Sequence, residues 1–123
     1  MSLAVIVGRL LIAALFVLTA LHGFMNFKEF TKTVAKYFPL PMLVAAVALS
    51  VKLLGGLAVG TGINLREGAL ALIVFLAIVT PLYHAFWNHP KEMPHFLKNA
   101  AIIGGLLILW SYYSPAVPTP VTA

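Results

Sequence analysis

Four long apolar segments constrain this chain more than any other feature, because each is close to the ~20 residues that an α-helix needs to cross a hydrocarbon core. The chain has 123 residues, of which 62% are hydrophobic and 9% are charged. That composition leaves too little polar surface to solvate a compact globule in water. We therefore predict an all-α integral membrane protein, a four-transmembrane-helix bundle with spans at Leu3–Gly23, Met42–Gly62, Ala69–Trp87 and Leu97–Tyr113.

The spans and their connections account for residues 1–113, which we interpret as a single membrane domain. The first segment has no basic stretch before its apolar run, so we interpret it as a retained span rather than a signal peptide. Residues 114–123 form a proline-rich C-terminal tail, for which we expect an extended, polyproline-like conformation.

An interfacial amphipathic helix is predicted between the first two spans, over about 27–38. Lysines recur there every fourth residue, while Phe27, Phe30, Val34 and Tyr37 follow helical spacing on another face. We expect the aromatic rings to enter the lipid headgroup region, and the lysines to anchor the helix to anionic lipid; the anchoring residues are Lys28, Lys32 and Lys36.

The basic residues also predict the orientation of the chain. With four spans, both termini and the Ile63–Gly68 turn share one face, here called side A, whereas the two other connections lie on side B. Side A has Arg66 and, two turns inside the first span, Arg9. Side B carries more positive charge, which makes it the cytoplasmic face; its lysines are Lys28, Lys32, Lys36, Lys91 and Lys98. In a bacterium this places the protein in the inner membrane with both termini in the periplasm.

Several functional classes are excluded or disfavoured by the sequence. With no cysteine there is no disulfide, thiolate ligand or redox thiol, so any redox chemistry requires a borrowed cofactor. The net charge of +5 follows membrane topology rather than a nucleic-acid surface. The histidines show no spacing of a preformed metal site, so no metal ligands are predicted, and no residue is assigned a catalytic role.

Lys52 lies near the centre of the second span, where a charged group is costly and therefore indicates function by default. It is about 15 Å from the side A end of its span, beyond the comfortable reach of a lysine side chain. All three acidic residues of the chain fall outside the predicted spans. Three alternatives remain for Lys52. It binds an anion or polar ligand, it pairs with an acid from another subunit, or it is neutral or solvated by backbone carbonyls. Arg9 faces the same bundle and is the second ligand candidate.

Small residues in the second and fourth spans predict close helix packing, as is common in membranes. They are Gly55, Gly56, Gly60, Gly104 and Gly105.

Polar and aromatic side chains are densest near the side B end of the third span. Pro81 cannot donate a hydrogen bond to the carbonyl of Ala77, so a kink is expected there. His84 and Trp87 follow, and both are candidates for contact with a quinone; for His84 we predict that it contacts the quinone or exchanges a proton. A wetted interfacial histidine in an aromatic belt is the alternative.

Motifs in each span resemble the DoxX family of small four-helix bacterial membrane proteins. They are Gly8-Arg9-Leu10-Leu11, Lys52-Leu-Leu-Gly55-Gly56-Leu, His84-Ala-Phe86-Trp87, and Phe96-Leu-Lys98-Asn99 followed by Gly104-Gly105. The family name is tied to subunits of thiosulfate:quinone oxidoreductase. The resemblance therefore implies a small subunit of a quinone-linked membrane oxidoreductase or electron-transfer complex, with quinone as the possible cofactor and no catalysis by the chain alone.

One departure from the family concerns Lys52, because relatives often carry an acidic residue before the Leu-Leu-Gly-Gly of the second span. The like charges of Arg9 and Lys52 would then require an anionic ligand or an acidic partner. Beside the lipid bilayer, we expect other membrane subunits or a second copy of the chain as partners. The alternatives to the redox function are a structural accessory subunit of a large membrane complex and a small transporter; the transporter is disfavoured because the spans contain no acid and no duplicated pair of broken helices.

Overall fold

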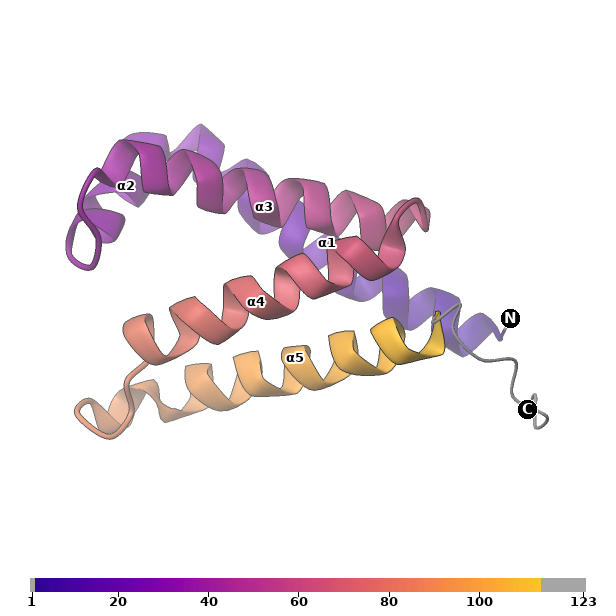
Figure 1. Ribbon diagram of the computed structural model, residues 1–123. Coiled ribbons are helices and arrows are strands. Elements are labelled where there is room, and N and C mark those ends of the chain that lie inside the picture. The colour runs from indigo at the N-terminus through magenta and orange to yellow at the C-terminus, as the bar shows by residue number, and fades with distance from the viewer. Residues whose placement is uncertain (1, 114–123) are drawn as a thin grey trace.

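The computed structural model describes residues 2–113, which are helical with no strand (Figure 1). Four of the described helices are long and apolar enough to cross a membrane, which confirms the predicted four-span, all-α fold. The predicted tail, 114–123, lies outside the described residues. The elements are α1 (Leu3–Met25), α2 (Phe27–Ala35), α3 (Pro41–Thr61), α4 (Leu65–Tyr83), the short 3₁₀ helix η1 (Pro90–Glu92) and α5 (Met93–Tyr112).

The third and fourth spans begin four residues earlier than the apolar pattern predicts. Gly62 ends α3 with a left-handed backbone (φ 82°), and its N–H donates to the carbonyl of Ala58. Asn64, also left-handed, then starts α4. The turn is therefore shorter than Ile63–Gly68, and Glu67 falls in the first turn of α4, where a carboxylate is favourable to the helix dipole. α4 continues only two residues beyond Pro81, so Trp87 lies outside the helix.

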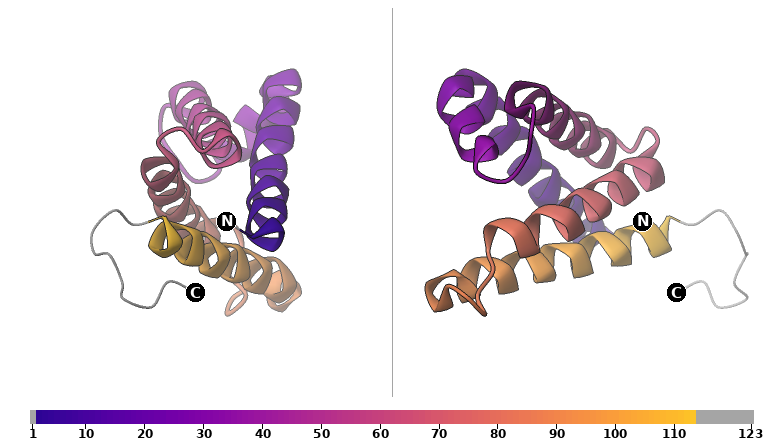
Figure 2. Two further views of the ribbon diagram at one scale, coloured as in Figure 1. Left: turned by 90° about the vertical axis from the view of Figure 1, so that its right-hand side faces the viewer. Right: turned by 60° about the vertical axis from the view of Figure 1, so that its left-hand side comes forward.

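The long helices pack in sequence order, α1 against α3, α3 against α4, and α4 against α5 (Figure 2). Glycines make the first two contacts close. A Cβ atom added at Gly56 would lie 3.1 Å from the Cβ of Phe16 on α1, and one added at Gly60 would lie 3.1 Å from the Cβ of Ala13. Between α3 and α4, Gly55 lies against Leu72. The backbones approach in the manner that small residues permit in membrane helices.

The glycines of α5 behave differently from one another. A Cβ atom at Gly105 would lie 3.3 Å from Cδ1 of Ile12 on α1, so this residue lies at a helix contact. A Cβ atom at Gly104 would meet nothing within 4 Å in the described part of the chain, so the predicted packing role does not apply to it. The two residues are neighbours in sequence, but they point about 100° apart around the helix.

At the side A end, all four long helices converge on one apolar core. Buried side chains from each of them contact one another there. Arg9 Nη1 donates to the hydroxyl of Tyr113 at 3.1 Å, joining the start of α1 to the end of α5. Arg66 Nε donates to the carbonyl of Trp110 at 3.2 Å, and its guanidinium lies 4.3 Å from the centre of the indole ring. These contacts close the bundle on side A; the core residues are Ala13, Phe16, Val59, Ala69, Leu72, Leu76, Leu106 and Leu109.

Toward side B, α3 and α4 separate. α3 and α4 meet at their short turn and diverge from it, so that they form a V (Figure 1). α2 packs on α3, with Val34 fully buried, and the segment after α2 reaches α4, where the rings of Tyr37 and Tyr83 have centroids 4.5 Å apart. This aromatic contact therefore connects the segment between α2 and α3 to the side B end of α4.

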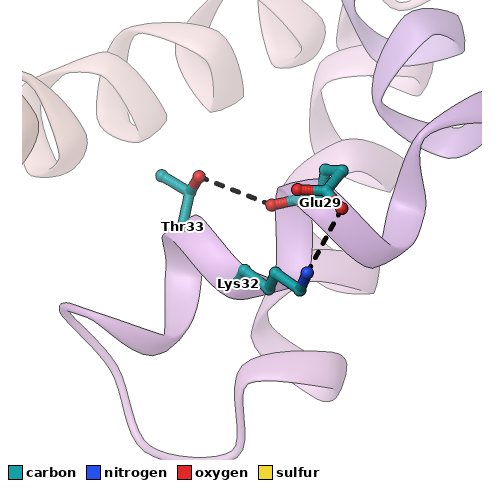
Figure 3. A network of polar contacts seen from close by, with 3 residues as sticks. All are labelled: Glu29, Lys32 and Thr33. Atoms are coloured by element: carbon teal, nitrogen blue, oxygen red, sulfur yellow. Dashed lines mark hydrogen bonds and ion pairs between the residues drawn. The ribbon is translucent and has the colours of Figure 1, made fainter.

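A helix lies between the first two spans as predicted, but two aromatic residues of the predicted segment contact the protein. The lysines of α2 are exposed, and Lys32 Nζ lies 3.3 Å from Glu29 Oε1 while Thr33 donates to the carbonyl of Glu29 (Figure 3). Phe30 and Tyr37, which the spacing assigned to lipid headgroups, contact the rest of the protein instead. Phe30 is half-buried by this packing, whereas Tyr37 remains 43% exposed.

We predict that Gly56→Leu destabilises the bundle, because the larger side chain must displace Phe16 and Val17. Overpacking of this kind typically costs about 1–3 kcal/mol. Thermal unfolding in detergent should show a lower midpoint. The matched control is Gly104→Leu, where open space accepts the side chain; equal losses in both variants would contradict the described α1–α3 contact.

We also predict that the Arg66–Trp110 ring contact stabilises the side A end by about 0.5–1 kcal/mol. A double-mutant cycle with Arg66→Gln and Trp110→Leu isolates the ring contact, since Leu removes the aromatic face and both variants keep the carbonyl at position 110. The free energy of unfolding is the readout. The same cycle with Trp87→Leu serves as the control, and a coupling no larger than in that control would rule the contact out.

Candidate functional site

A groove of about 990 Å³ occupies the V between α3 and α4. Its walls are mainly aliphatic and aromatic, and α1 and α5 contribute to its lining. Such a volume is typical of sites that take an organic ligand. The walls include Val44 and Val47 from α3, Val74 and Ile78 from α4, Phe16 from α1 and Ile102 from α5.

Lys52 lines this groove from α3. Its side chain is half-buried and makes no hydrogen bond or ion pair with any residue from 2 to 113. The helix brings it there because Lys52 shares a face with Ala45, Ala48 and Gly55, the face turned toward the rest of the bundle. Its ammonium is thus available as a hydrogen-bond donor to a ligand.

Glu67 also lines the groove, and the sequence analysis did not identify it as a candidate. It had been assigned to a turn, whereas the structure places it in the first turn of α4. No ion pair joins it to Lys52. The spacing of Glu67, Leu70, Val74 and Ile78 follows a helical face and could have indicated this position once the turn was recognised as short.

Arg9 and Lys52 are not brought together. Arg9 Nη1 lies 3.1 Å from the Tyr113 hydroxyl and would be 3.4 Å from a Cβ atom at Gly62, beyond the last turn of α3. A cation is favoured there by the partial negative charge of the helix end. Lys52 is ten residues earlier along α3, about 15 Å at 1.5 Å per residue. Arg9 therefore closes the bundle on side A, and it is not among the residues that line the groove.

A second polar cluster lies at the side B end of the groove, around His84. This residue follows the last residue of α4 and lines the groove; its Nδ1 lies 3.0 Å from Glu92 Oε1 of η1. Its ring stacks on His95, with centroids 5.2 Å apart and planes at 25°. The imidazole thus lies between an apolar groove and a carboxylate, an arrangement suited to proton exchange.

Asn99 is a further polar residue of this end; the sequence analysis included it in a family motif but not among the ligand candidates. Its Nδ2 donates to Thr80 Oγ1 at 3.2 Å, which connects α5 to α4 just before Pro81. Thr80 is 3% exposed, so the bond satisfies a buried hydroxyl. Asn99 and the neighbouring Lys98 both line the groove.

Trp87 does not line the groove and is 56% exposed. Its ring contacts Phe86 and Phe96, with centroids 5.4 Å and 6.0 Å away, in the segment between α4 and α5. The structure thus places it in an aromatic cluster at side B, outside the groove that His84 and Lys52 line.

The two polar ends of the groove are far apart. Gly55 of α3 lies opposite Gly68 of α4, so Lys52 is level with about Ala71. His84 is thirteen residues farther along, about 20 Å at 1.5 Å per residue. One headgroup cannot contact both, but an elongated ligand can occupy the apolar space between them. Within residues 2–113 there is no group of three histidine or acidic side chains that could hold a metal ion.

We predict that Asn99→Leu destabilises the fold by about 0.5–1.5 kcal/mol, the usual range for a hydrogen bond between membrane helices. Unfolding in detergent measures the effect. Asn88→Leu is the control, because Asn88 is exposed and makes no side-chain hydrogen bond among the described residues. No difference between the two variants would show that the Asn99–Thr80 bond contributes nothing.

Comparison with known proteins gives one match. The family model described as DoxX matches residues 4–85, which include all of α4, Arg9, Lys52 and His84. Neither the curated proteins nor the solved structures give a significant match.

Proposed function

Because this chain belongs to the DoxX family, we propose that it is a small subunit of a quinone-linked membrane oxidoreductase and holds a quinone in the groove between α3 and α4. The observation that carries this proposal is the groove of about 990 Å³, apolar along its walls and polar at both ends. Four membrane-spanning helices give the groove direct contact with the lipid phase in which quinones dissolve.

The groove fits the chemistry of a long-tailed quinone. Its aliphatic walls, such as Val47 and Val74, suit an isoprenoid tail, and burying that tail is favourable at roughly 25 cal/mol per Å². A quinone headgroup carries only hydrogen-bond acceptors, and Lys52 offers unpaired donors inside the groove. Asn99 and His84 offer further polar atoms at the side B end.

Each polar residue has a defined part in this proposal. A bound quinone supplies two-electron, two-proton redox chemistry. Lys52 orients the headgroup by donating to one of its oxygens and stabilises negative charge there. His84, held by Glu92, exchanges protons with water at the side B surface, but at about 20 Å from Lys52 it does not contact a headgroup held there. In this proposal the electrons come from a redox cofactor of a partner subunit, because the chain has no cysteine to act as a redox thiol.

We place the chain in the bacterial inner membrane, with both termini in the periplasm. The exposed lysines of α2 and Lys91 lie toward the same end of the bundle, and the positive-inside rule assigns that end to the cytoplasm. His84 then exchanges protons on the cytoplasmic side.

We predict that the protein, purified gently from its native membrane, retains a bound quinone. The Lys52→Ala and His84→Ala variants should retain a smaller amount of it. Mass spectrometry identifies the extracted quinone and the co-purifying subunits, and an absorption spectrum reports redox cofactors. His22→Ala is the matched control, because His22 is exposed and lies outside the groove.

The other outcomes of this experiment separate the alternatives. Stoichiometric redox subunits without a bound quinone would assign the chain to the accessory class. A colourless homo-oligomer free of quinone would contradict both functions.

A further inference from the structure

We infer that the groove selects a ligand whose headgroup is negatively charged, and that Lys52 is the residue that binds this charge. The inference rests on the proposed function, because it concerns the ligand of the same groove. It narrows the ligand from any long-tailed quinone to an amphiphile with an anionic oxygen, such as an ionised hydroxyquinone.

The first argument is the balance of charge along the lining. Lys52 and Lys98 both line the groove, and neither makes an ion pair or hydrogen bond within residues 2–113. His84 also lines it but already lies 3.0 Å from Glu92. Glu67 is the one carboxylate of the lining, against two lysines. A negatively charged ligand would offset this excess of positive charge.

The second argument is the position of Glu67, which is the alternative counter-ion for Lys52. Its side chain is exposed and lies near the apex of the V, where it also lines a smaller hollow with Asn64 and Gly68. No ion pair joins it to Lys52, although both residues border the same groove. Lys52 Nζ therefore has no counter-ion within residues 2–113.

The third argument concerns depth. Lys98 is exposed and lies five residues into α5, near the side B surface, where water competes for its charge. Lys52 is half-buried near the middle of α3, where the apolar surroundings make an unpaired charge costly. A lysine ammonium attracts an ionised oxygen more strongly than a neutral one, and the difference is larger where water is excluded. The deep lysine is therefore the one that discriminates by charge, and the tail of the ligand extends from it toward side B.

The test compares two pairs of probes that differ only in headgroup charge. The first pair is an alkyl hydroxynaphthoquinone, ionised at mildly alkaline pH, and the methylnaphthoquinone with the same alkyl chain. The second pair is oleate and oleyl alcohol. Binding to the full chain is measured in nanodiscs of zwitterionic phosphatidylcholine, so that anionic lipid does not compete.

We expect the anionic member of each pair to bind more tightly. Lys52→Gln should weaken its binding by about tenfold or more, the loss expected for a hydrogen bond to a charged group, and should change binding of the neutral member much less. Lys52→Arg keeps the charge and should keep the preference. Lys91→Gln is the control, since it removes the same charge from an exposed position outside the groove.

Glu67→Gln provides an independent arm. Removing this carboxylate should leave binding of the anionic probes unchanged or strengthen it, because it removes a like charge from the lining. Weaker binding of the anionic probes in Glu67→Gln would overturn the inference.

The remaining outcomes distinguish the inference from the proposed function. Equal binding of charged and neutral naphthoquinones, or a charge preference that survives in Lys52→Gln, would overturn the inference and leave quinone binding in place. Binding of oleate without any naphthoquinone would support the inference and contradict the quinone function. If no probe bound, both would fail.

Discussion

The close contact of α3 with α4 at their side A ends is the constraint on which the rest of the structure depends. Gly55 lies against Leu72, Gly68 lies against Ala58, and the turn between the helices is only three residues long. The two helices are in close contact at one end and are joined there by a short turn. Because packed helices cross at an angle, they separate with distance from that turn. The groove results from this geometry, because the divergence leaves a space that α1 and α5 only partly fill.

The sequence predicted the number and type of the elements because membrane spans are specified by a simple rule of length and apolarity. It was less successful at their ends. Leu65, Arg66 and Glu67 were assigned to a turn because the apolar segment was drawn from Ala69, whereas left-handed residues at Gly62 and Asn64 allow α4 to begin at once. Backbone conformations of this kind depend on single residues, and averages over long windows do not detect them.

The candidate site was predictable only in part, for a different reason. Lys52 was recognisable because a charge in an apolar span is unusual by itself. Pairing it with Arg9 failed, because helical projection gives the face on which a residue lies but not the neighbour that it meets. Arg9 instead contacts Tyr113, which lies 104 positions later in the sequence, and Asn99 of α5 donates to Thr80 of α4. Contacts between helices depend on tilt and register, which no local pattern contains.

The contact between Tyr37 and Tyr83 links the segment after α2 to the end of α4. One ring follows a helix whose lysines face outward, and the other lies at the end of α4, on the opposite wall of the groove. Val34 fixes α2 to the bundle on the same side. A displacement of α2 away from the bundle would strain the segment that carries Tyr37, so the position of this surface helix and the spacing of the groove walls are linked through the two rings.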